Sequence, residues 1–196
     1  FRHLPSKRAT MFAWKGKLLR IDLSRGNCSV EEIPPDLLRD YIGGRGAGLR
    51  ILFDEMDPRT DPLGPENKLI FATGPLVGTG VPAGGRYIVV SKSPLSGAIA
   101  NPCCGGYFGP NLKFAGYDLL IVEGQSPDPV YVVIRDDRVE IRPAAHLWGK
   151  WATETEHLIR SGMSGEFDVW ELNNMSIVTI GPAGENLVKF ACIMSD

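Results

Sequence analysis

The chain has 196 residues, a hydrophobic content of 43% and a formal net charge of −2. This length is enough for one domain with a substantial core, and the near balance of 21 basic and 23 acidic side chains gives no electrostatic basis for binding nucleic acid or an anionic membrane. No apolar run approaches the roughly 18 residues that a membrane-spanning helix needs. We therefore expect neither nucleic acid nor a membrane among its partners.

The four cysteines show none of the spacings that are typical of zinc or iron–sulfur sites. They are also too few and too unevenly spaced for a disulfide framework. This usage fits a reducing compartment, so the predicted location is the cytoplasm. If the protein uses an iron–sulfur cluster, its ligands lie outside this chain.

The first ten residues, FRHLPSKRAT, are basic but lack the apolar core and the cleavage site of a secretory signal. Met11 follows them and is suited to be a natural start. We therefore predict that residues 1–10 are an upstream or artificially added extension without a fixed fold, and that the domain spans residues 11–196. Because the chain stops directly after a predicted strand, we expect this domain to be truncated at its C-terminal end.

The first predicted elements are a hairpin and a helix. Residues 17–23 alternate apolar and polar side chains, and a glycine-containing turn leads to a second strand over residues 28–33. Two prolines end the sheet, and Asp36 is the predicted N-cap of the helix that follows. The glycine run at residues 43–48 is expected to interrupt this helix, which resumes over residues 49–56.

That glycine run does not match a nucleotide-binding loop. The dinucleotide spacing G-x-G-x-x-G requires glycine where the chain has Leu49, and the G-K-[ST] ending of a phosphate-binding loop is missing. A close approach of the helix to a neighbouring element, or to a cofactor, is what remains.

The rest of the chain is rich in predicted strands. We expect them at residues 68–72, 86–91, 118–123, 130–134, 138–141, 176–180 and 187–194, with one later helix at residues 150–160. On that helix Trp151, Thr155 and Leu158 share one face, and the glutamates point outward. Since most strands follow one another as hairpins, the sequence predicts an α+β domain with largely antiparallel sheets and a few helices packed against them.

The stretch from residue 82 to residue 118 carries the strongest binding signal. Two glycine pairs, Gly84-Gly85 and Gly105-Gly106, lie on either side of a β-branched strand, and glycine permits close approach to the main chain. Arg86 follows the first pair, and its guanidinium matches phosphate oxygens. The pattern suggests an anion-binding groove, but from these residues alone two tight turns and a surface arginine are the favoured interpretation, since paired glycines are first of all a turn signal.

No residues of the chain form a nucleophile–base set. Cys103-Cys104 could form only a strained ring disulfide, so two small side chains in a tight loop are the simpler interpretation. We expect His146 to be a partly buried packing residue and His157 to lie on a helix surface. Asp136-Asp137 fits the tip of a hairpin. From its chemistry the chain is a binding unit without a catalytic centre.

Longer motifs run through most of the chain. They are WKGKLLRIDLSRG (14–26), IGGRGAGLRIL (42–52), DPLGPENKLIFATGPL (61–76), GGRYIVVSKSPLSG (84–97), GGYFGPNLKFAGYD (105–118), HLWGK (146–150) and IGPAGENLVKFACIMSD (180–196). Together they resemble the N-terminal domain of the tungsten-containing aldehyde:ferredoxin oxidoreductase family. The resemblance implies a pterin-binding domain, a tungsten (or molybdenum) bis-pyranopterin with Mg²⁺, and a [4Fe–4S] cluster whose ligands lie beyond this chain.

The resemblance also implies roles for four residues. Arg86, in the GGRY motif, would contact the pterin phosphate region between cofactor and cluster. Gly105 and Gly106 belong to a cofactor-binding loop, and Gly105 would contact a phosphate. Cys103 stands where the family has an asparagine whose main-chain carbonyl binds the Mg²⁺ that bridges the two phosphates. Any residue supplies such a carbonyl, whereas a hard Mg²⁺ would not choose the thiolate.

By the same resemblance, the full-length enzyme would oxidise an aldehyde with water to a carboxylic acid. Its electrons would pass through the cluster to ferredoxin or an electron-transfer subunit. We expect this chain to be inactive alone, to be completed by C-terminal domains of the same polypeptide, and to form a homo-oligomer when full length. Two alternatives stay open: a fragment of the tungsten subunit of a class II benzoyl-CoA reductase, and a non-catalytic binding module with the same fold.

Overall fold

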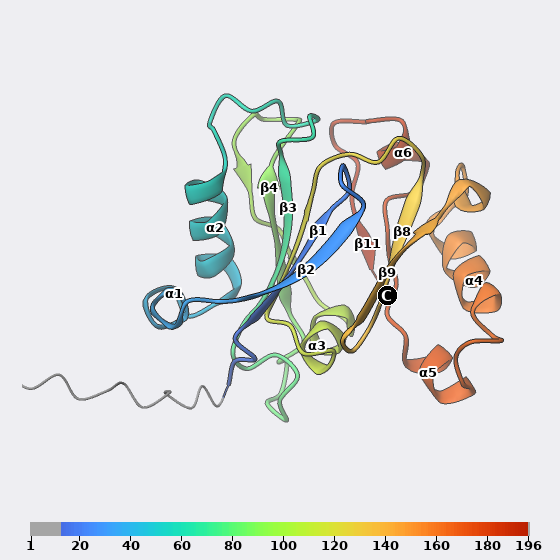
Figure 1. The fold of residues 1–196 in the computed structure, drawn as a ribbon, viewed down its shortest axis with the longest axis horizontal. Helices are drawn as coiled ribbons and strands as arrows, with labels where there is room; N and C mark the ends of the chain where they lie inside the picture. The colour runs from blue at the N-terminus through green and yellow to red at the C-terminus, as the bar shows by residue number, and fades with distance from the viewer. Residues whose placement is uncertain (1–12, 196) are drawn as a thin grey trace, which may run out of the picture.

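The computed structural model describes residues 13–195, so the prediction for residues 1–10 lies outside the described part. A seven-stranded sheet in the order β2-β1-β7-β3-β4-β5, with β6 also paired to β4, forms the centre (Figure 1). Its strands are β1 (Lys17–Asp22), β2 (Asn27–Glu32), β3 (Lys68–Thr73), β4 (Tyr87–Lys92), β5 (Ile99–Ala100), β6 (Cys103–Cys104) and β7 (Leu119–Glu123). Only the β1–β7 pair in this sheet is parallel. The predicted α+β class with largely antiparallel sheets is confirmed.

Two helices, α1 (Pro35–Tyr41) and α2 (Gly44–Glu55), cover one face of the sheet (Figure 1). Strand alternation directs every second side chain to this face, and the buried positions of α2 recur at helical spacing. The resulting core contains Leu18, Ile33, Leu38, Ala47, Ile51, Leu52, Ile70, Ala72, Val90, Leu119 and Ile121.

The opposite face packs against α3 (Phe108–Phe114) and the hairpin of β8 (Val130–Arg135) and β9 (Arg138–Pro143). Its core contains Leu19, Ile21, Phe71, Tyr87, Val89, Leu112, Tyr117 and Leu120. Beyond the hairpin lie α4 (Ala152–Gly162) and α5 (Val169–Asn174) (Figure 1), preceded by η1 (Ala145–Leu147). A small cluster of Val133, Met163 and Phe167 is buried in this part. The chain closes with β10 (Val178–Thr179), α6 (Gly181–Glu185) and β11 (Met194–Ser195).

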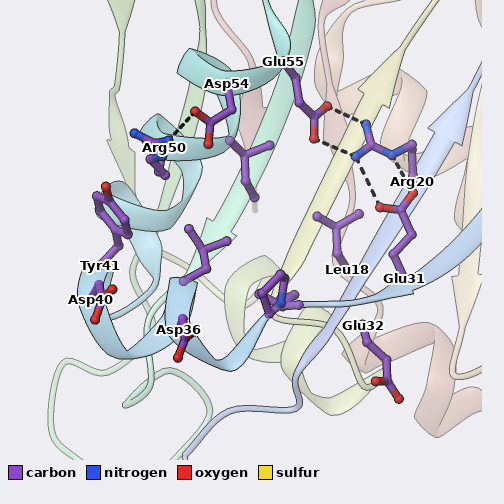
Figure 2. A pocket seen from close by; sticks show the side chains of 14 residues that line it. Leu18, Arg20, Glu31, Glu32, Asp36, Asp40, Tyr41, Arg50, Asp54 and Glu55 are labelled. Carbon is purple, nitrogen blue, oxygen red and sulfur yellow. Dashed lines mark hydrogen bonds and ion pairs between the residues drawn. The ribbon is translucent and has the colours of Figure 1, made fainter.

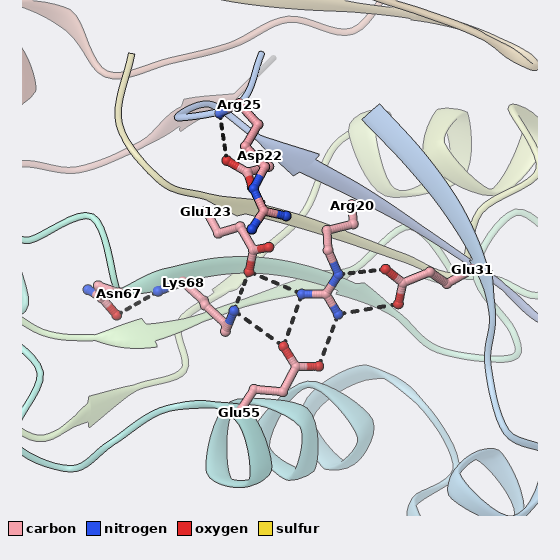
Figure 3. A network of polar contacts seen from close by, with 8 residues as sticks. All are labelled: Arg20, Asp22, Arg25, Glu31, Glu55, Asn67, Lys68 and Glu123. Atoms are coloured by element: carbon pink, nitrogen blue, oxygen red, sulfur yellow. Dashed lines mark hydrogen bonds and ion pairs between the residues drawn. The ribbon is translucent and has the colours of Figure 1, made fainter. Parts of the chain in front are cut away.

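A polar network fastens the far end of α2 to the sheet (Figure 3). Arg20 of β1 binds the carboxylates of Glu31 (2.7 Å), Glu55 (2.9 Å) and Glu123 (3.1 Å), and Lys68 binds Glu55 and Glu123. Burial alone would raise the pKa of Glu55, but hydrogen bonds and charge from Arg20 and Lys68 outweigh burial and hold that pKa below its ordinary value. The network joins β1, β2, β3 and β7 to the helix.

Two predictions about the first helices are wrong. The break between the two helices is confined to Ile42, the C-cap of α1 with a φ of 67°, and Gly43, so α2 begins at Gly44 inside the glycine run rather than at residue 49. A Cβ at Gly48 would lie 3.0 Å from Cγ2 of Val90, so the glycine lets α2 pack closely on the sheet. The N-cap of α1 is Pro34 rather than Asp36, which lies in the first turn.

The C-terminal part departs from expectation in three places. On α4, Trp151 is 74% exposed and Met163 at the C-cap is buried instead, so the predicted shared face is not the packed one. The last strand pair shrinks to β10 and β11, because Pro182 starts a short helix between them. His146 is exposed, with its ring 6.4 Å from that of Tyr131, rather than partly buried.

Other local expectations are confirmed. His157 lies exposed on α4, and Asp136 at the hairpin tip has a φ of 53°. Within residues 13–195 no helix is long and apolar enough to cross a membrane.

Candidate cofactor-binding site

Three glycine-containing segments meet at the end of the sheet where β3 ends and β4 begins, the lower end in Figure 1. They are residues 43–46, residues 74–86 and residues 103–109. A Cβ on Gly43 would lie 3.2 Å from the carbonyl oxygen of Thr73, and one on Gly85 would lie 3.0 Å from that of Gly106. The absence of side chains at these positions therefore allows the three backbones to touch.

The β4–β6 pairing brings the predicted binding residues together. Tyr87 lies opposite Cys104 and Ile88 opposite Cys103, so the same register carried one residue further places Arg86 across from Gly105. Arg86 and Gly105 are 19 residues apart in the chain, and they become neighbours because β6 pairs antiparallel with β4. The structure thus gathers Arg86, Cys103, Gly105 and Gly106 at one edge.

The main chain of Cys103 is directed away from β4. The N–H of Val89 donates to the carbonyl of Pro102 at 3.0 Å, which makes that pair a hydrogen-bonded one. Because such pairs alternate along an antiparallel ladder, the next pair, Ile88 and Cys103, is not hydrogen-bonded. The carbonyl of Cys103 therefore faces the open edge of the sheet.

The glycines differ in why they are needed. Gly84 is required by packing, since a Cβ there would lie 2.9 Å from the carbonyl oxygen of Leu76. Gly106 is required by its φ of 88°. Gly105 is required by neither, because a Cβ there would meet no atom within 4 Å and its φ is not left-handed. The turn interpretation thus accounts for Gly84 and Gly106, while the backbone of Gly105 faces open space.

Arg86 is exposed and forms no hydrogen bond or ion pair with any residue in the described part of the chain. Its guanidinium donors remain available beside the open main chain of Gly105. A planar cation next to an accessible backbone is a suitable receptor for a phosphate.

The two cysteines do not form a disulfide. Both are free, and as consecutive strand residues they point to opposite faces. Cys103 is exposed, whereas Cys104 packs partly buried against the core on the α3 side. The expected tight loop is in fact the short strand β6, which is how Cys103 reaches the edge.

A buried ion pair beneath the site escaped the sequence analysis. Lys113 of α3 binds Asp118, and their side chains are 5% and 1% exposed. Asp118 accepts from the N–H of Gly16 at 2.6 Å, and Lys113 donates to the carbonyl of Ala13 at 2.9 Å. The pair ties α3, which begins directly after the candidate site, to the first described residues. A Lys and an Asp five residues apart were the signal, but only the fold shows that both are buried.

Two hollows of the molecule lie away from the predicted site residues. A cleft of about 640 Å³ separates β1 and β2 from α1 and α2 (Figure 2). Charged side chains line it, and pairs such as Arg50 with Asp54 neutralise one another there. A second cavity of about 450 Å³ is mainly apolar and lies between the sheet and the β8–β9 hairpin. Neither is lined by a predicted site residue.

No group of three or more His, Cys, Asp or Glu side chains suited to a metal ion occurs among residues 13–195. A metal ion at this end of the sheet would have to be bound by main-chain oxygens of the protein and by atoms of a bound cofactor.

Comparison with known proteins identifies the family to which this chain belongs. A family model described as the N-terminal domain of aldehyde ferredoxin oxidoreductase matches residues 18–196. The chain therefore belongs to the aldehyde ferredoxin oxidoreductase family, and the predicted resemblance is confirmed.

The individual relatives are oxidoreductases by name, and two of those described here are named as tungsten-containing aldehyde ferredoxin oxidoreductases. The chain is 53% identical to the tungsten-containing aldehyde ferredoxin oxidoreductase of Thermococcus kodakarensis and 52% identical to that of Pyrococcus furiosus, over 95% of its length. It is 38% identical to the WOR-like subunit of an aliphatic sulfonate oxidoreductase from Pyrococcus furiosus, over 94% of its length and 31% of that relative's. The chain spans only 30% of the two aldehyde oxidoreductases.

A solved structure shares the fold. The active site complex BamBC of benzoyl coenzyme A reductase, in complex with 1,5-dienoyl-CoA, superposes with a TM-score of 0.86 and 41% identity. The match covers 94% of this chain and 27% of that one.

Proposed function

We propose that this chain is the cofactor-binding N-terminal part of a larger tungsten enzyme that oxidises aldehydes to carboxylic acids. Identity of about half to enzymes named for that activity supports the proposal. In the overall reaction an aldehyde and water give a carboxylic acid, two protons and two electrons. The electrons would leave through a [4Fe–4S] cluster to ferredoxin, with the cluster ligands in the remainder of the polypeptide.

The observation that carries the proposal is that Arg86, whose side chain has no partner among the described residues, lies across from the exposed backbone of Gly105. These residues fit the phosphate groups of a pyranopterin. The guanidinium supplies two parallel charged donors, and Gly105 lets a phosphate oxygen approach the main chain without meeting a side chain. Gly106 turns the chain sharply behind it with its φ of 88°.

Cys103 fits the proposed role at Mg²⁺. Its carbonyl, which the strand register directs toward the open edge, would serve as one oxygen ligand of a Mg²⁺ bound together with the cofactor. The thiol takes no part in this role, because soft sulfur is a poor ligand for Mg²⁺. Replacement of Cys103 by another residue should therefore leave metal binding intact.

The bound tungsten pterin supplies the redox chemistry. The residues of this chain would bind the phosphates, offset their negative charge and hold the group at a fixed angle to the sheet. The described residues around Arg86 offer no nucleophile–base pair, so proton transfer to and from the substrate falls to the rest of the polypeptide. We therefore expect the 196-residue chain alone to be inactive.

The test is metal and pterin analysis of the full-length protein, expressed without oxygen and with tungstate supplied. Folded protein should contain tungsten and pterin and should reduce an artificial electron acceptor with aldehydes. Arg86→Ala should lower pterin content, and Cys103→Ala should retain it. Active, folded protein that lacks tungsten, molybdenum and pterin would sink the proposal.

One observation favours a second function. The structural similarity to a benzoyl coenzyme A reductase complex, at 41% identity, makes an aromatic thioester a second candidate substrate. The identities of 53% and 52% to aldehyde enzymes favour the first. Parallel assays of the full-length enzyme with aldehydes and with an aromatic acyl-CoA decide between them. A non-catalytic module would show neither activity and would hold no tungsten.

A further inference from the structure

We infer that Arg45, near the start of α2, is a second phosphate-binding cation of this site and acts together with Arg86. The inference rests on the proposed function, because it assigns a residue to the same cofactor. The predicted binding residues all come from the segment around β4 and β6, whereas Arg45 comes from the helix packed on the sheet.

Arg45 and Arg86 differ from the other arginines of the described part. Each of the others forms an ion pair with at least one carboxylate; these are Arg20, Arg25, Arg39, Arg50, Arg59, Arg135, Arg138, Arg142 and Arg160. Arg45 and Arg86 are both exposed, and neither side chain has a hydrogen bond or ion pair with residues 13–195. The two arginines with free donors thus lie in the glycine-rich segments that meet at one end of the sheet.

The glycines place the start of α2 over the end of the sheet. A Cβ on Gly43 would lie 3.2 Å from the carbonyl oxygen of Thr73, and one on Gly44 would lie 3.8 Å from the amide nitrogen of Gly74. Thr73 pairs with Tyr87, the residue after Arg86. The first turn of α2 therefore lies one strand away from the backbone that presents Arg86.

Helix spacing assigns Arg45 to the flank of α2 nearer β4. Arg50 lines the cleft on the β1–β2 side of the helix, and five residues of helix turn a side chain by about 140°. Arg45 therefore points away from that cleft. One turn later, Gly48 approaches Val90 of β4, because a Cβ on Gly48 would lie 3.0 Å from Cγ2 of Val90.

Arg86 belongs to the same face of the sheet. Ile88 packs on the core beneath α2, as does Val90 further along the strand. Side chains two residues apart on a strand point to the same face, so Arg86 lies on the α2 side of the sheet together with Ile88. Cys103 pairs with Ile88 and therefore lies on that side too. Arg45, Arg86 and Cys103 thus converge on one face at one end.

Two unneutralised guanidiniums at one end of a sheet repel one another unless an anion lies between them. A phosphate removes that repulsion and accepts charged hydrogen bonds from both sides. The second cation also suits a ligand that carries two phosphates, because one arginine offsets only part of its charge. Arg45 should therefore slow cofactor loss from the holoenzyme.

The test compares the rate of cofactor loss among variants of the full-length protein loaded with tungsten. Tungsten and pterin per polypeptide are followed during anaerobic dialysis for wild type, Arg45→Ala, Arg45→Lys and Lys17→Ala. Lys17 is the matched control, an exposed lysine at the same end whose strand is separated from β4 by β7 and β3. Melting temperatures of the tungsten-free proteins report any damage to the fold.

We expect Arg45→Ala to lose cofactor about tenfold faster than wild type or more, since one charged hydrogen bond is removed. Arg45→Lys should be intermediate, Lys17→Ala should match wild type, and the tungsten-free melting temperatures should agree. Equal loss from Arg45→Ala and wild type overturns the inference while the proposed function stands. Wild-type protein that carries neither pterin nor tungsten or molybdenum overturns the proposed function, and the inference with it.

Discussion

At Gly46, the smallest possible side chain would already clash with the backbone. A Cβ there would overlap the main-chain oxygen of Tyr41, at the junction of α1 and α2. This junction also fixes Gly43 and Arg45 relative to the end of the sheet. The glycine run is therefore a packing device, which is one of the two explanations that the sequence left open.

Gly46→Ala should destabilise the protein by about 1–3 kcal/mol, because the clash outweighs the gain of about 1 kcal/mol in helix propensity. The measurement is chemical denaturation. Gly162→Ala is the control, since a Cβ at that helical glycine would meet nothing within 4 Å. Similar effects of both substitutions would show that the close approach to Tyr41 is not a constraint.

A second prediction at the scale of single residues concerns the buried ion pair of Lys113 and Asp118. Asp118→Asn removes the carboxylate that pairs with the buried Lys113 ammonium group, at a cost of about 3–5 kcal/mol. The double variant Lys113→Met with Asp118→Asn should recover part of this loss, because no unpaired charge remains. A single variant as stable as wild type would contradict a structural role for the pair.

At the scale of elements, the network around Arg20 makes stability depend on pH. The pKa of Glu55 is held below its ordinary value near 4.5 by Arg20 and Lys68, against the effect of burial. The stability from this carboxylate is therefore complete above about pH 4.5 and is lost as the pH falls through the lowered pKa. Arg20 remains charged throughout this range.

Glu55→Gln should therefore reduce the loss of stability between about pH 5 and pH 3, measured by urea denaturation at each pH. Asp54→Asn is the matched control on the same helix, because Asp54 forms only an exposed pair with Arg50. If the two variants follow the same pH dependence, the network does not couple α2 to the sheet in the way described.

The strands could be predicted where a short stretch of sequence alternates apolar and polar side chains or forms an apolar run. Residues 17–23, 68–72 and 118–123 alternate or form short apolar runs, and each is a strand of the central sheet. The segment after residue 180 was not predictable, since Pro182 and a left-handed Leu187 break the expected pairing. The glycine run was misread because sequence alone does not show that Gly48 faces Val90.

The candidate site also has residues that the sequence could predict and residues that it could not. Arg86 and the two glycine pairs could be singled out from a local motif, and the structure brings Arg86 next to Gly105. Arg45 could not, because its nearness depends on how α2 crosses the sheet. The role of all these residues at the cofactor stays a prediction.

At the scale of the whole molecule, apolar side chains surround the candidate site. Leu76, Val81, Tyr107 and Phe114 are 55%, 44%, 73% and 63% exposed. The 74–86 loop carries Leu76 and Val81 and approaches the Phe114 side chain at Gly78, while Tyr107 directly precedes α3. The chain spans 30% of the two aldehyde oxidoreductases that it matches, and we propose that further domains of a longer polypeptide cover this surface.

Hydroxyl-radical footprinting tests that cover. Tyr107 and Phe114 should be modified several-fold less in the loaded full-length protein than in the 196-residue chain alone. Phe53, which is 72% exposed on the outer side of α2, is the control and should change little. Equal modification of Tyr107 in both forms would mean that the site end stays open in the complete protein.

The central claim is that the cofactor lies at the end of the sheet where Arg86 faces Gly105. An experimental structure of the loaded full-length protein tests it most directly. We predict a pterin phosphate within about 2.7–3.2 Å of the Arg86 guanidinium and in contact with the main chain of Gly105. A pterin bound away from this end, with Arg86 still unpaired, would contradict the account.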